Sequence, residues 1–150
     1  MSLSSALRLP PNPSQSELQA WREVVTALLE KSIVGTIVTQ NNTPTELMRF
    51  NPRPQRTTFC KLVVVARRIG GSAGSANDGA TYIIYSGWTV KAGVATLLGA
   101  THTPTYQFED QAGWQAEVVI ANNRPILRVT GATNNIIRWA GKAEFFSTGI

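Results

Sequence analysis

Hydrophobic and polar positions follow two different periods along the chain. Up to residue 31, apolar side chains recur every three to four positions, which is typical of one face of a helix. From residue 32 onward they alternate with polar side chains, and turn-forming residues interrupt the alternation at short intervals. This second pattern is typical of antiparallel β-structure. The sequence therefore predicts a mainly β fold with one helix near its N-terminal end.

The predicted helix covers about residues 16–31. Ser16 and Gln19 have the spacing of a capping box, in which each side chain bonds the other residue's backbone N–H. The helix carries an apolar stripe, which is our candidate partner-docking surface: Leu18, Trp21, Val25 and Leu28. A second interpretation stays open, in which the stripe packs on the chain's own domain.

The segment before the helix is predicted to be an extended arm. Pro10-Pro11-Asn12-Pro13 fits neither a helix interior nor a central strand, because proline lacks the backbone N–H that both need. Such a stretch favours polyproline-like geometry. We therefore divide the chain into an N-terminal arm and docking helix, residues 1–31, and a β-sandwich domain, residues 32–150.

The alternating part of the chain is expected to form an antiparallel sandwich of the jelly-roll or lectin-like kind. Asn122-Asn123 fits a two-residue hairpin turn, because asparagine tolerates positive φ. Gly70–Gly79 is too rich in glycine for a strand and is predicted to be a loop. Trp139 alternates with charged residues and is expected in the core. The predicted strands are residues 33–39, 45–50, 57–68, 80–90, 95–99, 105–109, 114–121, 125–130 and 135–146.

Composition favours a protein that is covered in part by other chains. Only 15% of the residues are charged while 43% are hydrophobic, which is lean in charge for a soluble domain. A homo-oligomer or a larger complex is therefore expected. The 14 Lys and Arg residues outnumber the 9 Asp and Glu residues, but they are scattered, so nucleic acid is not an expected partner.

No targeting or membrane-spanning segment is expected. The start of the chain lacks a charged region followed by an apolar one, so we predict synthesis in the cytoplasm. No run approaches the ~18 apolar residues of a membrane span.

Residues that carry chemistry are few. His102 is the single histidine and is predicted to be a solvated loop residue. Glu109 and Asp110 are adjacent on a strand, so their side chains are expected on opposite faces. Cys60 is the single cysteine and is expected to be a buried free thiol, and one Cys with one His is too few for a structural zinc site. No catalytic residue, metal or cofactor is expected.

Aromatic side chains offer the one candidate small-ligand site. Tyr82, Trp88 and Tyr106 are candidate ligand-stacking residues, suited to sugars or bases if they share an exposed face. Tyr82 and Trp88 have the same alternation parity whereas Tyr85 has the other, so one of the two rows is expected in the core.

Several short sequence segments, taken together in their order and spacing, resemble the small β-sandwich domain of bacteriophage virion proteins that is common at the ends of tail fibres. The resemblance spans about residues 33–146. These segments are Asn42-Thr43-Pro44-Thr45-Glu46-Leu47, Val64-Val65-Ala66-Arg67-Arg68, Ala95-Thr96-Leu97-Leu98-Gly99, Gly113-Trp114, Leu127-Arg128-Val129-Thr130-Gly131 and Ile137-Arg138-Trp139-Ala140-Gly141-Lys142-Ala143-Glu144.

The resemblance implies a structural component of the virion. It implies no catalytic residues, because the family's shared positions are core tryptophans, turn glycines and strand ends. The main interpretation is a capsid-decoration (cement) protein docked through residues 1–31, since no long fibre shaft precedes the domain. The alternative is a tail-fibre or baseplate module that contacts a host receptor or glycan. A cell-wall hydrolase is a third interpretation, disfavoured by the scarcity of acid and base residues.

Overall fold

The computed structural model describes residues 11–22 and 32–149 of the protein. The β fold predicted from the alternation is confirmed, and the strands begin and end within three residues of the expected positions. The strands are β1 (Ser32–Thr39), β2 (Thr45–Arg49), β3 (Arg56–Gly70), β4 (Gly79–Lys91), β5 (Val94–Leu97), β6 (Tyr106–Glu109), β7 (Gln115–Ala121), β8 (Arg124–Thr130) and β9 (Ile136–Gly149).

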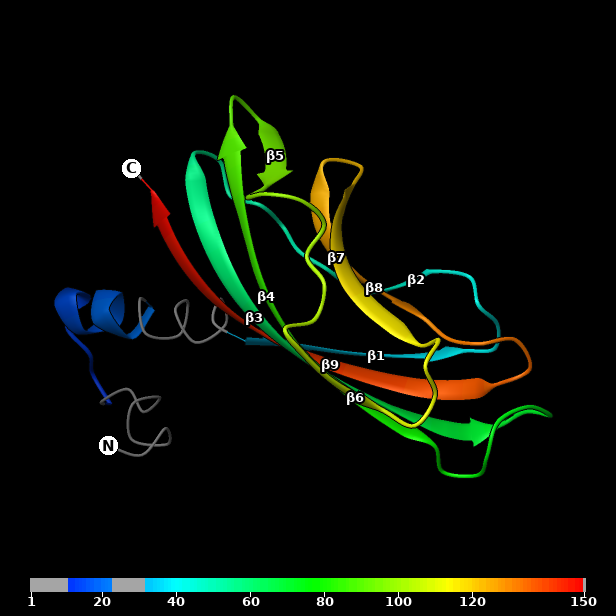
Figure 1. Ribbon diagram of the computed structural model, residues 1–150. Coiled ribbons are helices and arrows are strands. Elements are labelled where there is room, and N and C mark those ends of the chain that lie inside the picture. The colour runs from blue at the N-terminus through cyan, green and yellow to red at the C-terminus, as the bar shows by residue number, and fades with distance from the viewer. Residues whose placement is uncertain (1–10, 23–31, 150) are drawn as a thin grey trace.

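These strands form two antiparallel sheets. The larger sheet has the order β1-β9-β3-β4-β5. β5 pairs with the last part of the long strand β4, and β6 pairs with the first part of β4. The smaller sheet has the order β2-β8-β7. The long strands β3, β4 and β9 bend, so that the larger sheet curls around the smaller one (Figure 1). The predicted sandwich is confirmed.

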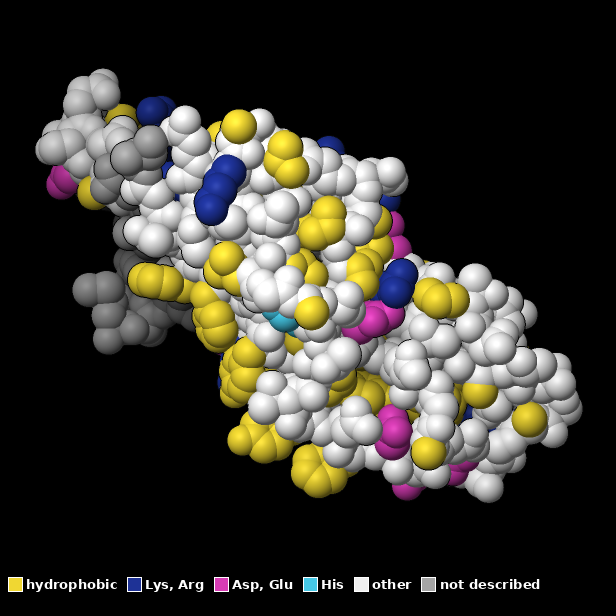
Figure 2. Space-filling view, turned by 45° about the horizontal axis from the view of Figure 1, so that its top comes forward, with side chains coloured by type: hydrophobic (Ala, Val, Ile, Leu, Met, Phe, Trp, Pro, Cys, Tyr) yellow, Lys and Arg dark blue, Asp and Glu magenta, His cyan; other side chains and the backbone are white. Residues whose placement is uncertain are grey.

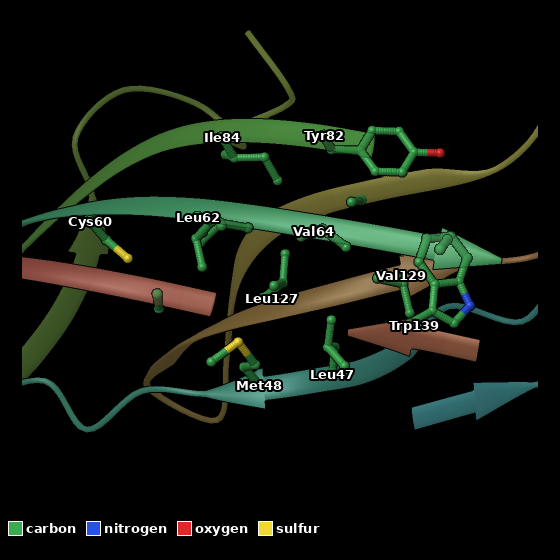
Figure 3. Packing of buried hydrophobic residues seen from close by; sticks show 14 of the residues in the cluster. Leu47, Met48, Cys60, Leu62, Val64, Tyr82, Ile84, Leu127, Val129 and Trp139 are labelled. Carbon is green, nitrogen blue, oxygen red and sulfur yellow. The ribbon is translucent and has the colours of Figure 1, made fainter. Parts of the chain in front are cut away.

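The core lies between the two sheets. On β3 the inward side chains Cys60, Leu62 and Val64 are fully buried, because period-two alternation places them on the concave side of the curled sheet. Leu127 and Val129 of β8 face them from the other sheet, and the two sets meet in the middle (Figure 3).

Two glycines let the sheets approach at one edge. Gly35 of β1 and Gly141 of β9 lie opposite each other in the register. A Cβ on Gly141 would lie 3.0 Å from Leu47 Cδ2, and one on Gly35 would lie 2.9 Å from Met48 Cγ, so larger residues would push β2 away. A bulge in β2 between Glu46 and Met48 turns both Leu47 and Met48 inward.

Trp139 is buried in the core, as its alternation predicts. Its Nε1 donates a hydrogen bond of 2.8 Å to Thr39 Oγ1, which links β9 to the edge strand β1. The ring lies 6.3 Å from the ring of Tyr82 and 5.9 Å from that of Trp114, measured between centroids. The Trp114 Nε1 is buried as well but has no hydrogen-bond partner.

The predicted turn at Asn122-Asn123 is confirmed. Both residues have positive φ, 50° and 61°, and the turn joins β7 directly to β8. Asn123 also holds the neighbouring hairpin: its Oδ1 accepts from the Ala95 N–H at 2.8 Å, and its Nδ2 donates to the Gly93 carbonyl at 2.8 Å. The predicted loop between Gly70 and Gly79 is confirmed too, since β3 ends at the first of these residues and β4 begins at the second.

The helix begins earlier than the sequence pattern predicts. Residues 15–22 are helical, and Ser14 is the capping residue in place of Ser16. The Glu17 N–H donates to Ser14 Oγ at 3.2 Å, and the Ser14 N–H donates to Glu17 Oε2 at 2.7 Å. The capping box of Ser14 and Glu17 is favoured over that of Ser16 and Gln19, because the negative charge of Glu17 is stabilised at a helix N-terminus. Leu18 and Trp21 are half-buried, whereas Val25 and Leu28 lie outside the described residues.

Candidate functional site

The candidate functional site is the convex side of the six-stranded sheet, which we call the outer face. Its side chains alternate with those of the core, and on β3 they are Phe59, Val63 and Val65, which are 48%, 38% and 45% exposed. A solvent-facing sheet surface normally carries polar residues. Here the outward row of β3 holds these three apolar side chains beside Lys61 and Arg67.

Aromatic side chains gather at one end of the outer face. Phe59 of β3 lies opposite Phe146 of β9 in the register, and its ring stacks on that of Tyr85 of β4 at 6.1 Å between centroids. Phe146 is 73% exposed. Such rings contribute little to the core, so their packing energy remains available to a partner.

The apolar surface crosses the sheet from edge to edge. Val63 pairs with Ile83 of β4, which pairs with the exposed Tyr106 of β6. At the other edge β1 adds the exposed Val34 and Val38. In the space-filling view a row of hydrophobic side chains follows one margin of the molecule (Figure 2).

The charges on the outer face are mostly positive. The outward charged side chains of β3 and β9 are Lys61, Arg67, Arg138, Lys142 and Glu144. Lys142 and Glu144 form an exposed ion pair at 3.5 Å. Four cations thus stand against one anion.

The candidate ligand-stacking residues do not share a face. Tyr82 and Trp88 point inward and are almost completely buried, so neither is available to stack on a ligand, and this expectation was wrong for both. The Tyr82 hydroxyl donates to Glu109 Oε2 at 2.9 Å. Tyr106 is 55% exposed on the outer face, where its role in ligand stacking stays a prediction.

Sequence reasoning missed the exposed aromatics. Phe59 of β3 and Phe146 of β9 occupy outward positions, and the signal for Phe59 was present in β3, where both alternating rows hold apolar residues. Tyr85 was considered only for its parity, which is opposite to that of Tyr82 and Trp88. Phe108 of β6 also belongs to this set and is 73% exposed.

His102 is not the solvated loop residue that the sequence predicts. Its backbone forms an isolated bridge with Val118 of β7, and its ring is half-buried. Nδ1 lies 2.6 Å from Ser86 Oγ, and Nε2 lies 2.9 Å from the Leu98 carbonyl oxygen. A hydroxyl beside an imidazole has the composition of a nucleophile and base. Ser86 is only 2% exposed, however, so a substrate does not reach its oxygen.

The remaining reactive side chains are also engaged or buried. Cys60 is inaccessible, and burial raises the pKa of its thiol to about 12. Glu109 and Glu117 both line a hollow of about 300 Å³, but the first accepts from Tyr82 and the second pairs with Arg128 at 2.6 Å.

Neither of two further kinds of site occurs in residues 11–22 and 32–149. No group of three or more His, Cys, Asp and Glu side chains there has an arrangement that would hold a metal ion. No helix in the same ranges is long and apolar enough to cross a membrane.

Solved structures that are similar to this chain include two phage tailspike proteins. No protein-family model and no curated protein matches the chain. The tailspike protein of Acinetobacter baumannii phage AM24 is similar over 78% of this chain and 28% of its own length, with 4% identity and a TM-score of 0.45. The tailspike protein of Acinetobacter phage vB_ApiP_P1 is similar over 77% and 21%, with 12% identity and a TM-score of 0.34. The chain thus spans less than a third of either tailspike.

Proposed function

We propose that this chain is a non-enzymatic binding module of a bacteriophage particle, and that its binding surface is the outer face of the six-stranded sheet. The observation that carries the proposal is the exposure of Phe59, Phe108 and Phe146 on one side of a sheet whose core is already filled. Large exposed apolar patches are rare on monomeric proteins and mark interaction sites.

The charges indicate what kind of partner fits this surface. In a symmetric dimer formed through the outer face, the same patch would meet itself, so the Lys and Arg side chains of one copy would lie against a surface that is also mostly positive. Like charges brought together at an interface are unfavourable. The partner is therefore a different protein with an apolar and acidic surface, another component of the particle.

The particle itself is inferred from the sequence resemblance to phage virion sandwiches. Their commonest context is the tail fibre, and we place this chain in the tail. Capsid decoration is the alternative; it depends on the docking role of Leu18, Trp21, Val25 and Leu28, which stays a prediction.

The non-enzymatic part of the proposal is supported by the burial of Ser86 and by the partners of Glu109 and Glu117. Incubation of the purified chain with host polysaccharide or peptidoglycan is expected to release no new reducing ends. Their release would contradict this part.

Cryo-electron microscopy of the particle tests the placement. The tail assignment predicts density for this sandwich on the tail, with the outer face against another chain. Density for it on the head would refute the tail assignment and favour the decoration alternative.

A further inference from the structure

Two arginines stand side by side at one end of the outer face. Arg67 of β3 and Arg138 of β9 are direct partners in the antiparallel register, and both are exposed. Directly opposed like charges destabilise a pair of strands. Cross-strand positions of this kind therefore favour a neutral or oppositely charged neighbour, and the observed pair needs an explanation.

The described parts of the chain offer this pair no acidic partner. Within the described ranges neither guanidinium takes part in an ion pair. Two other arginines of the chain provide the contrast: Arg49 binds Glu46 at 2.7 Å, and Arg128 binds Glu117 at 2.6 Å. Two unit charges thus remain uncompensated beside each other.

The pair lines a cleft that has room for a ligand. The cleft measures about 510 Å³, and Val65, Ile69 and Ala140 give it an apolar wall beside the two guanidinium groups. Asn77, in the loop between β3 and β4, also lines it. A charged end and an apolar side therefore lie within one hollow.

Local contacts hold one of the two arginines in place. Arg67 Nη2 donates to Asn77 Oδ1 at 2.6 Å. The loop that carries Asn77 is fixed by Arg68, whose Nε donates to the Ala73 carbonyl at 2.7 Å and whose Nη2 donates to the Gly71 carbonyl at 2.6 Å. A side chain that is positioned before binding loses less entropy when the ligand arrives.

We propose that Arg67 and Arg138 form a binding site for an oxyanion, a carboxylate or phosphate group carried on a partly apolar molecule. The planar guanidinium presents parallel N–H donors that match the oxygens of such groups, and two of them side by side compensate the charge. The site lies on the outer face, so the identity of its natural ligand rests on the proposed function. The binding of an oxyanion by these two arginines does not depend on the proposed function.

Side-chain NMR of the intact chain tests the site with small probes. The Nε–Hε signals of its arginines are followed while glutarate or inorganic phosphate is added at constant ionic strength, with chloride as the balancing anion. We expect saturable shifts of Arg67 and Arg138 with at least one probe, and none of Arg49 and Arg128. The probe that saturates at the lower concentration identifies the class of oxyanion. Equal, unsaturated drift of all four signals, or no shift with either probe, would overturn the proposal.

Substitutions separate a binding site from a general charge effect. Arg138→Thr removes the opposed charge, so the melting temperature should rise while the affinity measured at Arg67 falls about tenfold or more, because charge-assisted hydrogen bonds to the anion are lost. Lys142→Thr removes one charge from the same strand and face and should leave the affinity unchanged.

Three results would contradict the site: wild-type affinity in Arg138→Thr, an equal loss of affinity in Lys142→Thr, or a lower melting temperature in Arg138→Thr. All of these experiments use the isolated chain and small anions. A failure here therefore leaves the proposed docking of the apolar face to be judged by its own particle experiments.

Discussion

His102 Nδ1 lies 2.6 Å from the Oγ of Ser86, a buried residue of β4. The other ring nitrogen faces the Leu98 carbonyl oxygen, which only accepts hydrogen bonds. In the neutral imidazole Nε2 therefore carries the proton, and Nδ1 accepts from the Ser86 hydroxyl. The histidine satisfies a polar group that the core would otherwise leave unpaired, and it fastens the segment between β5 and β6 to the sheet.

This contact predicts that His102→Ala lowers the free energy of unfolding by about 1–3 kcal/mol, because a buried hydroxyl loses its acceptor. Ser86→Ala removes the same hydroxyl, so the double variant should cost less than the sum of the two single variants. Urea denaturation of the four proteins measures the coupling. Strictly additive effects would show that the two side chains do not interact.

The two tryptophans of the core predict unequal costs for the same substitution. Trp139 donates to Thr39, whereas the indole N–H of Trp114 has no partner. Trp139→Phe therefore also leaves the Thr39 hydroxyl without its donor. It should lower the free energy of unfolding, measured by urea denaturation, by about 1–3 kcal/mol more than Trp114→Phe does. Trp139→Ala should cost about 3–5 kcal/mol. Equal costs for the two Phe variants would mean that the bond to Thr39 adds nothing.

Alkaline pH should destabilise the fold through two buried groups. Burial, and secondarily the charge of Glu144, raises the pKa of Cys60 to about 12; burial and the bond to Glu109 raise the pKa of Tyr82. In the unfolded chain the thiol loses its proton near pH 8.5 and the phenol near pH 10, as rough reference values. The unfolded state then holds fewer protons, so the free energy of unfolding falls as the pH rises from about 9 toward 12.

Denaturation midpoints between pH 7 and 11 check this expectation, and Cys60→Ala is the matched variant. The decline near pH 9 should weaken in that variant. The native thiol should also fail to react with a disulfide reagent until urea is added. Rapid reaction in buffer would show that Cys60 is not in the core.

Removal of residues 1–31 tests the predicted division of the chain. The sandwich of residues 32–150 should keep its denaturation midpoint, and the shortened chain should no longer enter particles if the arm and helix are the docking device. Loss of folding instead would show that the helix belongs to the core.

The strands could be read from the sequence because alternation is a local signal. The choice of inward face was harder on β3, because Cys60 and Leu62 lie on one face while Phe59 and Val63 lie on the other, so that each face carries apolar residues. Only the pairing with β4 and β9 and the position of the smaller sheet decide which row is covered. The same limitation produced the wrong role for Trp88, whose burial depends on partners far along the chain.

Contacts between distant residues were out of reach for the same reason. Nothing near His102 in the sequence points to Ser86, and nothing near Arg67 points to Arg138, 71 positions away by the numbering. The helix cap is a different case: Ser14-x-x-Glu17 and Ser16-x-x-Gln19 both fit the pattern, and the charge of Glu17 favours the first.

The central claim, that the outer face binds another particle protein, has one direct test. The double variant Phe59→Thr/Phe146→Thr removes two exposed rings and keeps strand-forming residues, so its denaturation midpoint should stay close to that of the wild type. Ile126→Thr, on the outward side of the smaller sheet, is the control. The amount of each protein in purified particles is the measurement. The account predicts that the folded double variant is missing from particles while the control is incorporated normally; incorporation of the double variant at the wild-type level would contradict it.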